Sequence, residues 1–192
     1  MKKTEMNSEK IIKFPSSEII YVGIDPGREG AIVGRTKSEV VMKHRFPVIS
    51  DEIDLWGIQE IFKAYLNAEN TLYVVLEDVH SIFGVSAKAN FQFGRAVGII
   101  EAILVANNIT FTKVHPKKWQ TVLFQGIPEK RKPNKVEGKK GSLDTKPMAL
   151  LAAKRLYPSL DLRGSERSKN PHEGIVDALC MSHYCFLHYT KK

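Results

Sequence analysis

Cysteine is scarce in this chain, and a long apolar run is missing. Only two of the 192 residues are cysteines, Cys180 and Cys185, too few for a scaffold held by several disulfides, which fits a reducing compartment. No stretch reaches the about 20 apolar residues that a bilayer-spanning helix needs. Residues 1–17 have charged ends without an apolar centre, unlike a secretion signal. We therefore expect a cytoplasmic type of compartment and no membrane partner.

Acidic residues are outnumbered by basic ones. The chain has 21 Asp and Glu against 29 Lys and Arg, a net charge of +8 and a pI near 9.4. An excess of this size favours a polyanionic partner such as nucleic acid. The length allows one domain with a substantial core but is too short for two full domains.

The two cysteines interleave with histidines in a pattern that invites a zinc interpretation. Cys180, His183, Cys185 and His188 form C-x2-H-x-C-x2-H. At about 100° per residue, these positions fan around more than half of one helix. A single straight helix cannot gather them around a tetrahedral ion, so we expect ordinary packing.

Hydrophobic periodicity predicts a mixed α/β fold. Three strands joined by hairpin-length connections come first, and a continuous apolar strand follows the first helix, as in a strand covered on both faces. The predicted strands are 19–25, 31–36, 39–46, 72–76 and 110–114, and the predicted helical segments are 51–68 (with Asp51 as a possible cap), 99–106, 118–124, 147–157 and 173–188. This order predicts a ribonuclease H-like five-stranded mixed sheet, three antiparallel strands and then two parallel ones, flanked by helices.

We expect one such domain over residues 18–190. Residues 1–17 would form a flexible basic N-terminal tail. Residues 125–143, which are rich in lysine and in Gly and Pro, would form a mobile basic loop.

Four carboxylates are predicted to meet at one edge of this sheet. In the predicted arrangement the first strand, ending at Asp25, is central, and the fourth, ending at Glu77, lies beside it. Glu173 and Asp177 are four residues apart, so they share one helix face although like charges there repel. Oxygen ligands select Mg²⁺ or Mn²⁺, and two such ions about 4 Å apart can promote phosphodiester hydrolysis. We therefore predict a metal-dependent nuclease site.

Four short segments of the chain together resemble those of a known nuclease family. The segments GIDPGREGA, VVLEDVH, GVSAKANFQFG and HEGIVDAL, in this order, resemble those of the RuvC-type Holliday-junction resolvases, especially their compact phage-like and organellar relatives, over about residues 21–184. The resemblance implies a homodimeric endonuclease that nicks four-way DNA junctions symmetrically with Mg²⁺ and leaves 5′-phosphate ends. It also implies a bacterial or phage-infected host cell.

The resemblance assigns the acids unequally. Asp25, Glu77 and Asp177 match the family's acids, whereas Glu173 stands where relatives more often carry Asp or His. Asp78 is a weaker candidate because strand alternation points it away from Glu77.

Basic residues near the acidic edge are predicted to bind phosphates. They are Arg28, Lys88, Arg95, Lys117, Lys118, Lys130, Arg131, Lys132, Lys135, Lys139 and Lys140. By resemblance, His80, Phe83 and Phe91 are candidates for contact with the junction core, although we expect at least two of Phe83, Phe91 and Phe93 to be buried. His115 is expected to hydrogen-bond locally or contact phosphate, and Trp119 to lie in the core or a dimer contact.

The second helix suggests how two copies pair. Residues 93–104 contain more apolar side chains than one helix side can bury on a sheet. We predict that part of this surface forms a two-fold dimer contact.

Three alternatives stay open at this stage. The same scaffold could belong to another nuclease, acting on other branched DNA or on RNA–DNA hybrids, or to a non-catalytic junction-binding protein. Acids on a DNA-facing surface argue against the last, because they repel phosphate unless a metal neutralises them. An actin-like or sugar-kinase-like ATPase shares a D-x-G hairpin but needs two related domains, so no nucleotide cofactor is expected.

Overall fold

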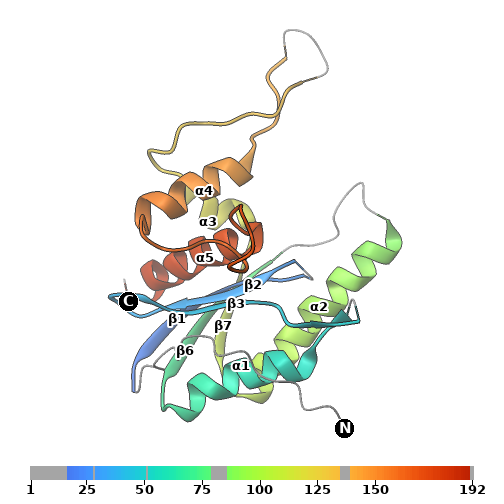
Figure 1. Cartoon of the computed structure of the whole chain (residues 1–192), viewed down its shortest axis with the longest axis vertical. Coiled ribbons are helices and arrows are strands. Elements are labelled where there is room, and N and C mark those ends of the chain that lie inside the picture. The colour runs from blue at the N-terminus through green and yellow to red at the C-terminus, as the bar shows by residue number, and fades with distance from the viewer. Residues whose placement is uncertain (1–16, 28, 51, 79–85, 135–138, 191–192) are drawn as a thin grey trace.

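The protein is built around a five-stranded sheet between two helical layers. Figure 1 shows a computed structural model, which describes residues 17–27, 29–50, 52–78, 86–134 and 139–190. The predicted N-terminal tail, except Ser17, lies outside these residues, as do Arg28, His80, Phe83 and Lys135. The domain boundaries therefore stay a prediction.

The sheet has the predicted composition. Its order is β3-β2-β1-β6-β7, in which β1 pairs antiparallel with β2 and parallel with β6. The strands are β1 (Ile19–Asp25), β2 (Ala31–Arg35), β3 (Val40–Arg45), β6 (Thr71–Glu77) and β7 (Thr110–Val114). The predicted central position of the first strand, with the fourth beside it, is confirmed. Because Ile24 pairs with Leu76, Asp25 and Glu77 end their strands at the same edge.

The helix α5 (Glu173–Thr190) crosses the sheet directly over β1. Gly23 makes this approach possible, because a Cβ there would lie 2.2 Å from the Ala178 carbonyl oxygen and 2.3 Å from the Ser182 nitrogen. At the start of the helix, a Cβ on Gly174 would lie 2.3 Å from the Glu29 oxygen in the β1–β2 turn. Two glycines thus fix the height of α5, and with it Glu173 and Asp177, above the end of β1.

The same layer contains α3 (Pro116–Leu123) and α4 (Thr145–Leu156). Trp119 and Leu123 from α3 and Ala149, Ala152 and Ala153 from α4 are buried with the apolar face of α5. Small side chains on α4 let it lie close to α5, as the 3.6 Å contact from Cys180 Sγ to the Ala149 oxygen indicates.

The opposite face of the sheet carries α1 (Leu55–Asn67) and α2 (Ala87–Ala106). Both differ from their predicted ranges. The short strands β4 (Val48–Ile49) and β5 (Glu52–Ile53) form a hairpin where the sequence predicted the start of α1. Asp54 takes the N-cap position with extended backbone and no side-chain cap bond, whereas Asp51, the predicted cap, lies outside the described residues.

The helix α2 begins at Ala87, well before the predicted residue 99. Ser86 caps it by accepting a hydrogen bond from the Ala89 nitrogen at 3.2 Å. Gly94 and Gly98 do not interrupt it, because a cost of about 1 kcal/mol per glycine is small beside the cap and the packing of Ile100 and Leu104.

By length and composition alone, α2 could also cross a membrane, contrary to our finding that no segment qualifies. Only a minority of α2 is buried, with Ala96, Ile100 and Leu104 on the protein's own sheet, and a single helix of this kind is weak evidence for a membrane segment.

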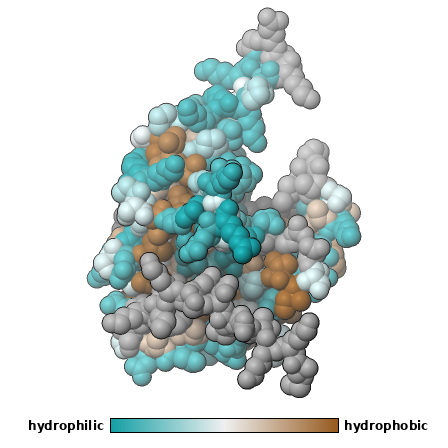
Figure 2. Space-filling model, viewed as in Figure 1, coloured by the Kyte–Doolittle hydropathy of each residue, from teal (hydrophilic) through white to brown (hydrophobic). Residues whose placement is uncertain are grey.

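The predicted basic loop projects from the molecule as a narrow arm above α4, and its described surface is hydrophilic (Figures 1 and 2). Backbone hydrogen bonds from Lys132 to Ser142 (2.9 Å) and from Asp144 to Lys130 (2.8 Å) join its two sides. We call residues 129–143 the basic arm.

Candidate active site

Asp25 lies at the edge of the sheet where the predicted acids were expected to meet. Burial raises its pKa well above the ordinary value, and the carboxylates of Glu77, Asp177 and Glu173 raise it further, while Lys146 acts in the opposite direction. These mutual effects show that the four acids lie within electrostatic reach of one another. The prediction had placed them together from strand order and helix spacing alone.

Glu77 is held by a tryptophan. The indole Nε1 of Trp119 donates a hydrogen bond to Glu77 Oε1 at 3.0 Å, and the ring is only 1% exposed. Burial raises the pKa of Glu77, whereas this hydrogen bond lowers it. Trp119 therefore lies in the core, one of its two predicted places, and it also fixes an acid of the site.

Glu173 and Asp177 occupy the first two turns of α5, next to a lysine of α4. Lys146 Nζ forms an ion pair with Glu173 Oε2. Burial, followed by the charges of Glu77 and Glu173, raises the pKa of Asp177 to about 7, and Lys146 opposes this shift. Both partners of the ion pair are largely exposed, so the pair lies at the solvent side of the site.

The chemistry of these ligands fits a hard divalent cation. All four candidate ligands are carboxylates. Burial, followed by the charges of the neighbouring acids, raises the pKa values of Asp25 and Asp177, and a bound cation would offset both effects. Within the described residues, however, no three Asp, Glu, His or Cys side chains are already grouped so that they could hold one ion. Glu77 is turned to Trp119 and Glu173 to Lys146 instead.

A cavity of about 260 Å³ opens beside the acids between α4 and α5. It shares Lys146, Glu173 and Asp177 with the site, and its remaining lining is apolar. The other lining residues are Pro147, Leu150, Pro171 and Val176.

Comparison with known proteins defines the fold. No protein-family model matches the sequence, and no curated protein sequence matches it. Among solved structures, T. thermophilus RuvC in complex with Holliday junction substrate superposes with a TM-score of 0.52 at 13% identity, covering 88% of this chain and 96% of that chain. The Thermus thermophilus RuvC structure gives 0.51 at 15% identity, covering 89% and 96%. The chain has the RuvC fold.

On this RuvC fold, the predicted phosphate-binding residues occupy three separate places. Lys88 and Arg95 lie on α2, where Arg95 is paired with Glu52 of β5 at 3.0 Å. Lys117 and Lys118 lie in the first turn of α3. The others that the structure describes, Lys130, Arg131, Lys132, Lys139 and Lys140, belong to the basic arm, where Arg131 is paired with Glu129.

The other residues that the sequence singled out have the following surroundings. Phe91 is 70% exposed, whereas Phe93 is partly buried near the β1–β2 turn, where a Cβ on Gly27 would lie 4.0 Å from its Cδ2. Because Phe83 lies outside the described residues, the expectation that at least two of the three phenylalanines are buried stays a prediction. His115 caps α3 by accepting from the Lys117 nitrogen at 3.2 Å, a local bond as expected. Asp78 is paired with Lys113 at 3.5 Å.

The interleaved Cys and His residues have separate partners. Cys180 Sγ donates to the Ala149 oxygen and Cys185 Sγ to the Tyr73 oxygen. His183 Nδ1 lies 2.9 Å from Arg35 Nη1. These side chains face different neighbours around α5, as the helical geometry predicted.

Sequence reasoning missed two residues of this site. Lys146 lies between the predicted basic loop and the predicted helix 147–157 and was given no role, and Trp119 was predicted to lie in the core or a dimer contact. Neither lies at a recognisable spacing from the acids, since α3 and α4 meet β6 and α5 only through tertiary packing.

Proposed function

We propose that this chain is a metal-dependent endonuclease that resolves four-way DNA junctions by symmetric phosphodiester hydrolysis and leaves 5′-phosphate ends. The observation that carries the proposal is that Asp25, Glu77, Glu173 and Asp177 lie within electrostatic reach of one another in a chain of net charge +8. The RuvC fold supports it, since one neighbour of that fold is described in complex with Holliday junction substrate.

In this proposal Asp25, Glu77 and Asp177 hold the cation, with Glu173 joining once it leaves Lys146. Mg²⁺, which Mn²⁺ can replace, would supply Lewis-acid activation of water and stabilise the leaving oxygen, with two ions per site. Trp119 orients Glu77 by occupying Oε1, so that Oε2 remains the available donor. Lys146, once released, is a cation placed to balance phosphate charge beside the acids.

DNA would be held by basic residues that flank this edge. The basic arm joins the layer of α3, α4 and α5 at the start of α4, and Lys117 and Lys118 lie in the first turn of α3 in the same layer. Phosphate contacts of this type provide affinity without sequence readout, which suits recognition of a branched shape. Arg28, Lys135, His80 and Phe83 stay candidates from the sequence.

Two active sites related by a two-fold axis would explain symmetric nicks, and α2 is the surface we assign to the dimer. Of its 20 residues only Ala96, Ile100 and Leu104 are fully buried, while Phe91 and Val105 are 70% and 64% exposed. A Cβ on Gly94 or Gly98 would meet no other atom within 4 Å, so this side of the helix is open to a partner. We place the protein with DNA in the cytoplasm of a bacterium or phage-infected cell.

One cleavage assay tests the proposal against its alternatives. Labelled four-way junction, linear duplex and RNA–DNA hybrid are incubated with the protein in Mg²⁺, Mn²⁺ or chelator. We expect paired symmetric nicks in the junction alone, and none in chelator. Hybrid cleavage would instead indicate a ribonuclease, and binding without cutting an architectural role.

Matched variants locate the site. Asp25→Asn should abolish cutting and leave junction binding intact. Asp54→Asn, at the start of α1 on the other side of the sheet, removes an acid that makes no side-chain cap bond and should cut like the wild type. Cutting by Asp25→Asn at the wild-type rate would refute the assigned site.

A further inference from the structure

The cavity between α4 and α5 differs in character from the acids beside it. We call it the α4–α5 pocket, and four of its seven lining residues are apolar: Pro147, Leu150, Pro171 and Val176. Metal binding and phosphate chemistry need none of these side chains. Its volume of about 260 Å³ is that of a site for a small organic group rather than for an ion alone.

The walls of this pocket are fixed by surrounding structure. Val176 is buried, and Leu150 packs on the core that joins α4 and α5. Pro171 ends the connection between these helices, where a backbone bridge pairs it with Arg163 and the His172 nitrogen donates to the Leu162 oxygen at 2.8 Å.

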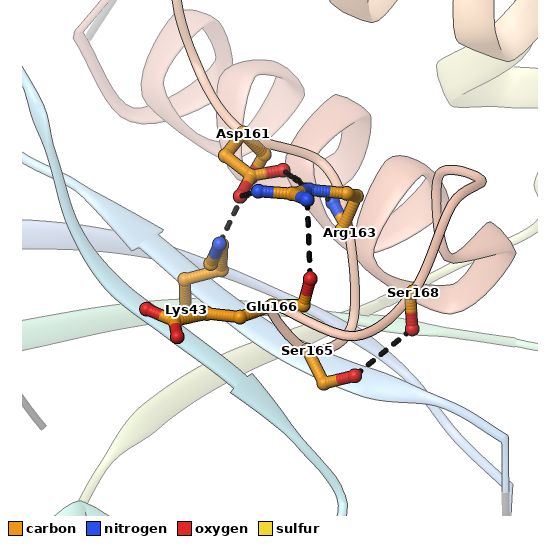
Figure 3. A network of polar contacts seen from close by, with 6 residues as sticks. All are labelled: Lys43, Asp161, Arg163, Ser165, Glu166 and Ser168. Carbon is orange, nitrogen blue, oxygen red and sulfur yellow. Dashed lines mark hydrogen bonds and ion pairs between the residues drawn. The ribbon is translucent and has the colours of Figure 1, made fainter.

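Side-chain contacts hold the same connection in place, as Figure 3 shows. Arg163 forms a two-pronged pair with the Asp161 carboxylate and donates to the backbone carbonyl oxygen of Glu166. Lys43 of β3 donates to the backbone carbonyl oxygen of Asp161 at 2.9 Å. The Arg163 guanidinium keeps the pKa of Asp161 below its usual range, so this pair stays charged. A pocket with walls held in this way loses little entropy when it is filled.

We propose that the α4–α5 pocket binds one unstacked nucleobase of the strand that is cut, next to the phosphodiester held at the acids. The inference rests on the proposed function. Glu173 and Asp177 belong to both the pocket and the acid cluster, so a nucleotide whose phosphate lies at the acids has its base within reach of the pocket. Pro147, Leu150 and Pro171 offer apolar surfaces to the base, and Lys146 lies at the charged side of the pocket.

This arrangement would contribute to the choice of substrate. In a linear duplex every base is paired and stacked, and moving one into a pocket requires it to be unstacked first. At a branch point bases are more easily unpaired, so the pocket favours a junction over a duplex without reading phosphate positions. The need to unstack a base beside the cleaved bond would therefore select junctions over linear duplexes.

The inference is tested with modified junctions. In one series a single nucleotide near the cleavage site is replaced by an abasic residue, which retains the sugar and the phosphate. We expect wild-type cleavage to fall about tenfold for an abasic residue at one position adjacent to the cut and to change little elsewhere. The second series carries 2-aminopurine at that position, and its fluorescence should rise when the non-cutting Asp25→Asn protein binds.

Variants at Leu150 connect these effects to the pocket. Leu150→Trp fills the pocket, so it should cut the intact junction about tenfold more slowly, lose its sensitivity to the abasic residue and suppress the 2-aminopurine signal. Leu150→Ala removes an apolar wall without obstructing the pocket, so it tests the pocket even if the tryptophan variant misfolds. It should reduce the loss of cleavage rate that the abasic residue causes. Leu151→Trp is the matched control, because Leu151 is partly exposed on the same helix and does not line the pocket.

The outcomes separate this inference from the proposed function. Junction cleavage that is equally fast with an abasic residue at every adjacent position would overturn the pocket assignment and leave the nuclease proposal standing. The assignment also fails if Leu151→Trp behaves like Leu150→Trp. Absence of any junction cleavage by the wild type would overturn both.

Discussion

Replacing Gly23 by alanine tests how α5 is positioned over the sheet. The added Cβ would lie 2.2 Å from the Ala178 oxygen, 2.3 Å from the Ser182 nitrogen and 2.7 Å from the Met181 carbonyl carbon. All three are backbone atoms of α5, so no side chain can turn away to make room. Ordinary contacts begin near 3.4 Å, so the middle of α5 must move by about 1 Å.

This displacement has a calculable cost. Overpacking of a well-packed core costs about 1–3 kcal/mol. A clash of the new Cβ with backbone atoms, which cannot rotate away, belongs at the upper end of this range. A loss of about 3 kcal/mol is more than a hundredfold in the unfolding equilibrium constant and, with a urea slope of about 2 kcal/mol/M, lowers the midpoint by about 1.5 M. Since Asp177 precedes Ala178, the same shift should also disturb the acid cluster.

Urea unfolding followed by circular dichroism measures the effect. Gly98→Ala is the control, because a Cβ there meets no other atom within 4 Å and alanine is the better helix former; it should gain up to about 1 kcal/mol. If Gly23→Ala unfolds at the wild-type midpoint, α5 does not approach β1 as closely as described, and the placement of Glu173 and Asp177 loses its support.

Three further predictions concern separate parts of the molecule. Trp119→Phe leaves buried Glu77 without its donor, so single-turnover cleavage should fall about tenfold while junction binding in a gel-shift assay is unchanged; unchanged cleavage would remove the orienting role. Val105→Glu should convert the proposed dimer to a monomer in sedimentation, whereas Leu151→Glu, on α4, should not; a wild type that sediments as a monomer would refute the dimer assignment. Burial, then Arg35 and Arg155, lowers the pKa of His183 to about 4. At this histidine the unfolded chain binds more protons between about pH 4 and 6.5, which contributes a rise of about 1–2 kcal/mol in the free energy of unfolding after allowance for partial exposure. The raised pKa values of Asp25, Glu77 and Asp177 lower the free energy of unfolding as pH rises over the same range. The histidine's part is therefore measured as the difference in urea midpoint between the wild type and His183→Gln, which should change in favour of the wild type as pH rises.

The sheet could be predicted because its signals are local. Strand β1 alternates between two buried faces, with Ile20, Val22 and Ile24 on the α1–α2 side and Tyr21 on the α5 side, and β6 is apolar from Leu72 to Leu76. Short hairpin connections then leave few possible orders for the first three strands. The boundaries of α1 and α2 were wrong where a two-residue hairpin replaced a helical turn and where a serine cap outweighed two glycines.

The nearness of the four acids could be predicted and their partners could not, for a single physical reason, while the acids' role as an active site stays a prediction. Asp25 and Glu77 lie at strand ends, and Glu173 and Asp177 share a helical face, so their places follow from local geometry. Trp119 and Lys146 reach the site only because α3 and α4 pack beside α5, which depends on shape rather than on spacing. Trp119 donates a hydrogen bond to Glu77 and Lys146 donates one to Glu173, so each of these carboxylates is engaged by a donor. If a cation binds as proposed, these donors must share Glu77 and release Glu173, so metal affinity should depend on α3 and α4 as well as on the four acids.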